Sequence, residues 1–569
     1  MKSNLLKAFV PAMALAMFLG TSVVHAEEAE TVNTAATAPV TVKTDDGWMM
    51  GAEIDGVYTF KGIPYAKAER FQMPEDPDSW DGLRICSVYG ESCPNGSTIV
   101  SAADFLTPSG TDNVSNEDCQ YLNVWTTSMD TEAKKPVIFW LHGGGWQNGS
   151  ASELAYYEGE NLSRSQDVVF VSINHRLNVL GFTDLSAYGE EYQYSGNVGV
   201  ADMVKALEWV QDNIALFGGD PDNVTIVGQS GGGGKVGLLC ALPAAEGLFQ
   251  KGVICSGGGW NGLSQDETQA AGVALVEKTK ETYGLETDEE ALEKLKTISY
   301  DELKSLSSGT GVGQGPVVDG DYYPQPLVGE DGRMAESAND IPLIVTTTYA
   351  ETMLNLSFLS VTQAAGSVTQ GMENPDDFLA AYSQTYATEE GVRSQLEAKY
   401  GDKTDALLEL FHEAYPGHTD FDLLWLNTGS LYESAKEIVN ARVEAGGAPL
   451  YRGVWSYEFP IFGGCPAWHT GGDLPFLFAN TDKIDYLIAG DEEAAQALSD
   501  LAATALCNFA RTGDPSQEGL EWESYTADNK AEMVFDHNTE LRVDFDTELR
   551  ELIGYDDGWG SKADAQHGK

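Results

Sequence analysis

Basic residues are scarce in this chain of 569 residues. It has 33 lysines and arginines against 88 aspartates and glutamates, which gives a formal net charge of −55 at pH 7. A surface of this sign repels phosphate groups, so the composition argues against nucleic acid and anionic membranes as partners. We interpret the charge as a solvated surface that keeps an exported protein soluble. Electrostatic steering of cationic substrates is the alternative.

Long apolar runs are lacking after the N-terminus. Residues 1–26 carry two lysines near their start, continue as an apolar run and end in Val24-His25-Ala26, the small-residue cleavage pattern of a secretory signal peptide. A transmembrane anchor is disfavoured because the uncharged stretch is short and acidic residues follow it at once. Residues 27–38 are polar and are expected to form a disordered leader. The sequence therefore predicts a secreted or extracytoplasmic protein without a membrane anchor.

Cysteine and histidine are also few, with seven and eight in the chain. No segment has His and Cys at the spacing of a metal site, so we predict neither a metal nor an organic cofactor. In an exported protein, seven cysteines allow disulfides but leave at least one thiol unpaired. Those to which the sequence assigns no partner are Cys86, Cys240, Cys255, Cys465 and Cys507.

The most informative stretch covers residues 196–234. Apolar residues recur at helical spacing as far as Phe217, and residues 224–227 are typical of a short buried strand. Gly228-Gln229-Ser230-Gly231-Gly232 follows and fits the G-x-S-x-G nucleophile elbow, in which glycines avoid clashes in a strained turn. An ordinary glycine-rich turn is the alternative, but the strand before it and the apolar run after it favour the elbow. Ser230 is therefore the predicted nucleophile.

Strands and helices alternate along the rest of the chain. The runs typical of buried core strands, rich in β-branched and aromatic residues, are 137–140, 168–171, 342–345 and 450–455. This alternation predicts an α/β fold with a mainly parallel sheet and helices on both faces. Helical patterns at 266–306 and in much of 375–444 are interpreted as cap insertions over the active site of one domain, residues 39–569. A separate second domain is the alternative.

Several sequence blocks in a fixed order give the chain a specific resemblance. They are FKGIPYA (60–66), EDCQYLNVW (117–125), LHGGGW (141–146), INHRLNVLGF (173–182), GPVVDGDYYP (315–324) and DLPFLF (473–478). Together with the elbow, they resemble the type B carboxylesterases of the α/β-hydrolase superfamily over nearly the whole mature chain. The resemblance implies the α/β-hydrolase fold and a serine esterase that hydrolyses carboxylic esters through an acyl-enzyme, and the signal pattern adds that it is exported.

A serine hydroxyl needs a general base, and the base needs an acid that fixes its tautomer. The other histidines fall in the signal, the tail, polar segments, a glycine loop or a strand end, which leaves His469. It follows Ser230 in the order that α/β-hydrolases use, and a structural histidine beside Trp468 is the alternative. The resemblance of IPLIVTTTYAET to the family's strand-end pattern assigns the acid to Glu351, with Asp319 as the runner-up.

An ester carbonyl under attack develops an oxyanion, which backbone amides can stabilise. By resemblance, the donors are the amides of Gly144, Gly145 and Gly231. Trp146, beside this loop, and Trp260, after the strand near residue 254, are candidates to shape the acyl pocket. Core packing is the alternative for both tryptophans.

Three features qualify the resemblance. It pairs Cys93 with Cys119 as a disulfide, which in the chain-entropy view contributes roughly 3 kcal/mol. Gln229 stands where the family usually has glutamate, so a negative charge beside the base is lacking. No tryptophan lies between Cys93 and Cys119, which leaves choline esters unsupported.

The sequence thus predicts a carboxylesterase that acts on small-molecule esters, and it assigns no oligomeric state. One rival has the same fold but is a plant-cell-wall esterase, which releases feruloyl or acetyl groups. The other is a catalytically silent binding or adhesion protein. That class typically loses triad residues, whereas Ser230, Glu351 and His469 are all present.

Overall fold

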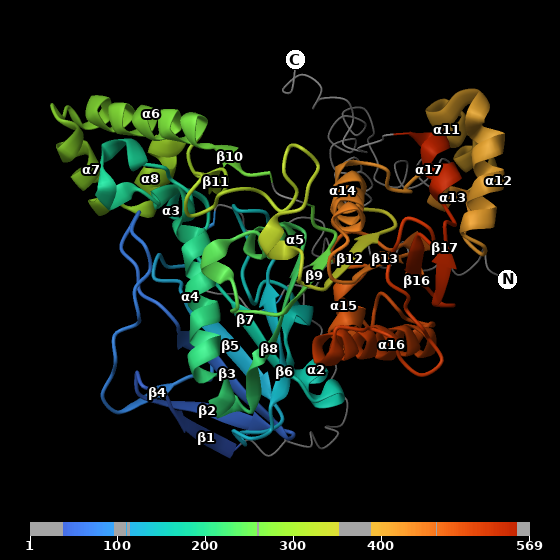
Figure 1. Cartoon of the computed structure of the whole chain (residues 1–569), viewed down its shortest axis with the longest axis horizontal. Helices are drawn as coiled ribbons and strands as arrows, with labels where there is room; N and C mark the ends of the chain where they lie inside the picture. The colour runs from blue at the N-terminus through green and yellow to red at the C-terminus, as the bar shows by residue number, and fades with distance from the viewer. Residues whose placement is uncertain are drawn as a thin grey trace, which may run out of the picture. The chain divides into compact units, whose positions relative to one another are not determined.

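A large twisted sheet organises the structure, a computed structural model that describes residues 38–95, 110, 114–258, 261–351, 388–461 and 464–554. Within these ranges its strands lie in the order β1 (Ala38–Lys43), β2 (Trp48–Ile54), β3 (Val57–Pro64), β5 (Tyr121–Thr126), β7 (Val169–Ile173), β6 (Lys135–Leu141), β8 (Gly219–Gln229), β9 (Lys251–Cys255), β12 (Leu343–Thr348), β13 (Leu450–Trp455), β16 (Ala531–Phe535) and β17 (Glu540–Val543), and β4 (Leu83–Ile85) pairs with β2. The strands from β7 to β16 run parallel, and both ends of the sheet are antiparallel. Figure 1 shows this sheet with helices around it, which confirms the predicted α/β class.

Both faces of the sheet are buried, as parallel strands require. Along β6, Ile138 and Trp140 join one apolar cluster, while Val137, Phe139 and Leu141 join a second. The first cluster includes α15 (Leu474–Leu477) and α16 (Glu492–Thr512). The second includes α4 (Val198–Asn213), α5 (Gly231–Cys240) and α14 (Ser430–Ala445). Uninterrupted apolar strands are therefore explained by helices that cover each face.

The insertion helices form two groups (Figure 1). The first, α6 (Gln265–Tyr283), α7 (Asp288–Thr297) and α8 (Tyr300–Ser307), confirms the helical pattern predicted at 266–306. The second contains α11 (Glu389–Tyr400), α12 (Thr404–Ala414) and α13 (Asp420–Leu423), beside α17 (Thr547–Ile553). The part of the predicted helical stretch before residue 388 lies outside the described residues.

From Ala38 onward the described residues belong to one compact unit. The predicted signal, 1–26, and nearly all of the predicted leader lie outside the described residues. Among the helices that are described, none is long and apolar enough to cross a membrane.

Candidate active site

Ser230 stands at the turn between β8 and α5, with φ 57° and ψ −124°. A residue with a side chain rarely adopts this conformation, which marks a strained turn of the elbow type. The Ser230 amide donates to the carbonyl of Cys255 at 2.9 Å, which fixes the turn to the end of β9. Glycine is required around it, because a Cβ on Gly228 would lie 2.2 Å from the carbonyl oxygen of Gly232. A Cβ on Gly232 would in turn lie 2.0 Å from the carbonyl oxygen of Leu141.

The glycine loop after β6 packs directly against this turn. Gly144 and Gly145 have φ of 81° and 63°, the left-handed region that favours glycine. A Cβ on Gly231 would lie 2.4 Å from the amide nitrogen of Gly145, and one on Gly143 would lie 3.4 Å from Cβ of Ser230. No backbone hydrogen bond given for the described ranges has the amide of Gly144 or Gly145 as its donor. Gly231 begins α5, so its amide has no acceptor in a preceding helical turn. The structure therefore brings the predicted oxyanion donors together beside Ser230.

The imidazole of His469 is hydrogen-bonded to the predicted acid. Its Nδ1 lies 2.7 Å from Oε2 of Glu351, whose Oε1 accepts from the amide of Thr348 at 2.8 Å. Glu351 is buried, whereas the His469 side chain is 23% exposed. Burial lowers the pKa of His469, but the hydrogen bond and charge of Glu351, with a contribution from Asp473, raise the pKa above 6.5. The carboxylate makes Nδ1 the N–H donor and leaves the lone pair on Nε2.

Gln229 is the group that meets this lone pair. Its side-chain nitrogen lies 3.2 Å from Nε2 of His469, and its Oε1 accepts from the Thr470 hydroxyl at 3.1 Å. The second bond fixes which end of the amide faces the ring. Within the described part of the chain, no hydrogen bond joins Ser230 to His469. A buried, neutral amide thus occupies Nε2 of His469. The sequence analysis did not find this contact because Gln229 and His469 are distant in the chain.

Lys235 is a buried residue of α5 that the sequence analysis also missed. Its ammonium group donates to the carbonyl oxygen of His142 at 2.9 Å and so braces the glycine loop. Burial, partly offset by the charge of Glu153, lowers the pKa of Lys235 to about 7. Burial and then the charge of Lys235 lower the pKa of His142 well below 6.5, which keeps that imidazole neutral. A lone lysine in a glycine-rich apolar helix was the available sequence signal.

A second buried carboxyl group lies near the pair formed by Glu351 and His469. Asp473 caps α15, with its Oδ1 accepting from the amide of Leu474 at 2.8 Å. Burial and then the charge of Glu351 raise the pKa of Asp473 to about 7. The sequence identified this residue only as part of the DLPFLF block. Its effect on His469 depends on the folded arrangement.

The runner-up acid has a different role. Asp319 accepts from the amides of Asp321 and Tyr323, each at 2.9 Å, and from the side chain of Asn197 at 3.0 Å. It therefore closes a turn, and none of these hydrogen bonds involves His469. A hydrogen-bonded turn explains its place in the GPVVDGDYYP block.

Of the two tryptophans predicted to shape the acyl pocket, the structure describes Trp146. Trp146 follows the glycine loop and is 3% exposed, with its ring edge-on to Phe182 at a centroid distance of 5.4 Å. It also lies within the second apolar cluster, so packing holds it beside the loop. Trp260 lies outside the described residues. The role of both in acyl recognition stays a prediction.

The predicted Cys93–Cys119 disulfide is not present in the structure. Both residues are buried free thiols, and Cys93 Sγ accepts from the amide of Leu177 at 3.2 Å. Burial and then a hydrogen bond with Cys93 raise the pKa of Cys119 well above its usual range.

The sequence profile of the carboxylesterase family matches residues 38–551. The chain therefore belongs to the carboxylesterase family, and it is a carboxylic ester hydrolase with the α/β-hydrolase fold. This confirms the resemblance to type B carboxylesterases that the sequence blocks indicate.

The chain is similar to para-nitrobenzyl esterase of Bacillus subtilis (strain 168), with 30% identity over 90% of this chain and 98% of that protein. Among solved structures, it is similar to an esterase from the anaerobe Clostridium hathewayi that can hydrolyse aliphatic aromatic polyesters. That structure has a TM-score of 0.79 and 36% identity and covers 91% of this chain and 99% of its own. A carboxylesterase of Geobacillus stearothermophilus gives a TM-score of 0.66 and 30% identity, with coverage of 90% and 100%.

Proposed function

We propose that this ester hydrolase uses Ser230 as nucleophile, His469 as general base and Glu351 as the acid that orients it. The observation that carries the proposal is the 2.7 Å contact between Nδ1 of His469 and Glu351. This contact directs the lone pair of Nε2 away from Glu351, where the Gln229 amide meets it, and Ser230 lies against the glycine loop. Nucleophile, base, acid and oxyanion donors are the parts that acyl transfer requires.

In the first half-reaction, the Ser230 hydroxyl transfers its proton to Nε2 of His469 as Oγ bonds to the ester carbonyl carbon. The carbonyl oxygen gains the negative charge and is stabilised by the amides of Gly144, Gly145 and Gly231, each typically worth ~3 kcal/mol of barrier. The C–O bond to the alcohol then breaks, and the imidazolium protonates the departing alcohol. Water repeats these steps on the acyl-enzyme and releases the acid and the free serine.

Gln229 adds one step before attack. Because its amide donates to Nε2 of His469, the Ser230 hydroxyl must replace that donor when substrate enters. Hydrogen bonds of catalytic groups often tighten only in the substrate complex. The exchange substitutes one neutral donor for another, so it requires no change in the charge of the ring.

Export is the second part of the proposal. It is supported by the signal pattern of residues 1–26 and by the net charge of −55. N-terminal sequencing of protein recovered outside the cytoplasm should begin near Glu27. A mature protein that retains residues 1–26 in the cytoplasm would contradict it.

The nucleophile is tested with a fluorophosphonate probe, which phosphonylates an activated serine. The wild type should be labelled and Ser230→Ala should not, while the exposed control Ser264→Ala should label like the wild type. Turnover of p-nitrophenyl acyl esters should vanish with the label, and hydroxycinnamate esters in the same panel test the cell-wall alternative. Labelling that persists in Ser230→Ala would identify another serine as the nucleophile.

A further inference from the structure

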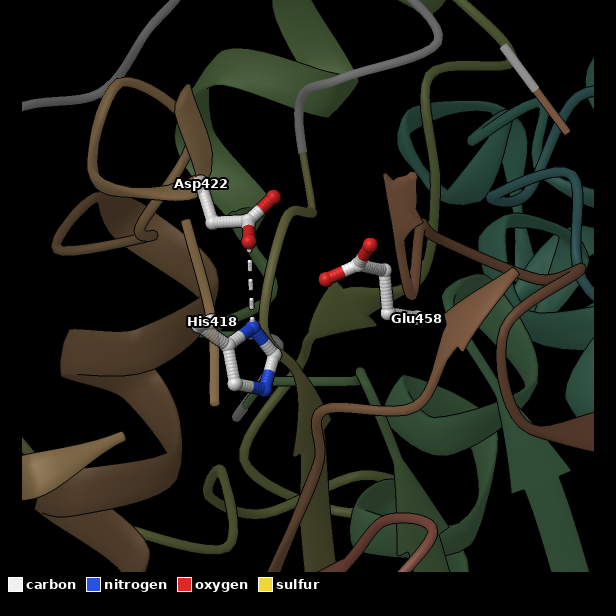
Figure 2. A group of neighbouring side chains, drawn as sticks. All are labelled: His418, Asp422 and Glu458. Carbon is white, nitrogen blue, oxygen red and sulfur yellow. Dashed lines mark ion pairs between the residues drawn. The ribbon is translucent and has the colours of Figure 1, made fainter. Parts of the chain in front are cut away.

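A second group of reactive side chains meets where the α12–α13 insertion contacts the sheet. His418 lies just before α13, Asp422 lies within it, and Glu458 lies on the short strand β14 (Glu458–Phe459). Each offers one nitrogen or oxygen atom, and these three atoms all lie within 4.8 Å of one another. Figure 2 shows the imidazole and the two carboxyl groups turned toward a common space. None of the three belongs to the triad of the proposed function.

Two atoms that face this space have no hydrogen-bond partner. They are Nδ1 of His418, which makes an ion-pair contact with Oδ2 of Asp422 at 3.3 Å but no hydrogen bond, and Oδ1 of Asp422, in residues that are 8% and 0% exposed. The other oxygen of Asp422 is used, because it accepts from the amide of Thr419 at 2.9 Å. Buried polar atoms are nearly always satisfied in folded proteins, since an unmade hydrogen bond costs free energy. Both unpartnered atoms are also electron-pair donors of the kind that bind cations.

The far side of His418 has the arrangement found behind metal-bound histidines. Its Nε2 lies 2.9 Å from Oδ2 of Asp536, and that oxygen also accepts from the Ser456 hydroxyl at 2.8 Å. A carboxylate on one ring nitrogen places the proton there and directs the lone pair of the other nitrogen outward. Here the outward nitrogen is Nδ1, the atom that faces Asp422 and Glu458.

The carboxyl groups of Asp422 and Glu458 are held close together away from bulk water. Asp422 is buried, Glu458 is half-buried, and one oxygen of each lies within 4.8 Å of the other and of a His418 nitrogen. Two carboxylates in such a place repel each other unless a proton or a cation lies between them. We infer that His418, Asp422 and Glu458 form a binding site for one divalent cation, with zinc as the fitting ion.

The donor set selects the metal. Ca²⁺ and Mg²⁺ prefer oxygen ligands alone, whereas one imidazole with two carboxylates suits zinc. Two ligand atoms at ~2.0 Å from a tetrahedral zinc are about 3.3 Å apart. Nδ1 of His418 lies 3.3 Å from Oδ2 of Asp422, an oxygen that can bind the ion while it keeps its hydrogen bond from the Thr419 amide. Water completes the fourth position. The sequence analysis predicted no metal because the ligands come from separate segments without a recognisable spacing.

The cation would connect the second helical insertion to both segments that carry the catalytic pair. Glu458 pairs with Pro466 through β14 and β15 (Cys465–Pro466), and His469 follows shortly after β15. The ring of Tyr349, two residues before Glu351, stacks on His418 with centroids 5.4 Å apart. The ion does not touch the reacting atoms in this arrangement. Its role is to hold these segments together, so its loss is expected to change stability more than chemistry.

The test is zinc titration by calorimetry on the full mature chain without a histidine tag, after dialysis against EDTA. The wild type and Ser230→Ala should each bind one equivalent of Zn²⁺, so the result does not depend on the proposed nucleophile. At ~100 times Kd, zinc should raise Tm by about 2 °C. Turnover of p-nitrophenyl acetate by the wild type should change less than about twofold.

Variants decide where the zinc binds. Glu458→Gln removes a ligand charge and should weaken binding about 100-fold, and Asp536→Asn should weaken it about 10- to 100-fold through the ring orientation. His412→Gln is the matched control, because His412 pairs with Asp420 at 2.8 Å on the surface of the same insertion. It should bind like the wild type. Near-UV circular dichroism checks that each variant is folded. If Glu458→Gln unfolds, Asp536→Asn serves as the deciding variant. No stoichiometric binding, or binding unchanged in the variants, would overturn the inference and leave surface carboxylates as the only zinc ligands.

Discussion

His469 and His418 both have an imidazole beside a carboxylate, and they differ in which group faces the second ring nitrogen. His469 has Glu351 at Nδ1 and the neutral amide of Gln229 at Nε2. His418 has Asp536 at Nε2, and Asp422 lies 3.3 Å from its Nδ1. Against the opposing effect of burial, these two carboxylates raise the pKa of His418 to about 9.

The comparison shows that carboxylates on both sides change what an imidazole can do. One carboxylate orients His469 and leaves a lone pair that accepts a proton near neutral pH. Carboxylates at both nitrogens keep the ring of His418 bound to a positive charge, either a proton or a metal ion. The role of each histidine is thus set by its neighbours rather than by its own chemistry.

The largest expected effect comes from replacing Glu351, the carboxylate that orients His469 in the proposed function. Glu351→Gln should lower kcat by about 10⁴-fold, because an amide neither fixes the tautomer nor stabilises the imidazolium. The measurement is steady-state hydrolysis of a p-nitrophenyl ester, with folding checked by circular dichroism. Asp319→Asn is the control and should keep most of the activity. If a folded Asp319→Asn loses activity while Glu351→Gln keeps it, the acid is Asp319.

A smaller effect should follow when His469 is made to resemble His418. Gln229→Glu puts a carboxylate at Nε2 and should raise the pKa of His469 further above 6.5. The neutral ring is the active form, so activity rises with pH through this pKa. The acid limb of kcat/KM should therefore move to higher pH, with a loss of about three- to tenfold at pH 7. The exposed change Gln193→Glu adds the same charge elsewhere and should leave the limb in place. A limb that does not move in Gln229→Glu would mean that His469 does not control it.

The smallest expected effect comes from Asp473, which raises the pKa of His469 without touching it. Asp473→Asn keeps the cap on α15, because an amide oxygen can still accept from the amide of Leu474. The acid limb should move to lower pH, with a gain of less than about threefold at pH 6. A pH-rate profile on a neutral ester measures it. A shift to higher pH would contradict the assigned influence of Asp473.

Sequence patterns predicted the structural features that depend on residues adjacent in the chain. The strand at 137–140 and the elbow around Ser230 are visible because buried strands and strained turns restrict residue type locally. The Gln229–Thr470 contact and the His418 cluster are not visible, since tertiary packing brings their members together from distant segments. The two thiols of Cys93 and Cys119 illustrate a third case. The family resemblance predicts a disulfide between them, whereas the structure has both as buried free thiols.

The contacts of the glycines around Ser230 have a consequence for engineering the enzyme. At Gly228, Gly231 and Gly232, even an alanine methyl group would collide with backbone atoms of the turn or of the glycine loop. Libraries randomised at these positions should therefore yield few active clones. Variation toward new esters is therefore better directed at positions outside this turn and the glycine loop, where a new side chain does not collide with the backbone that carries Ser230.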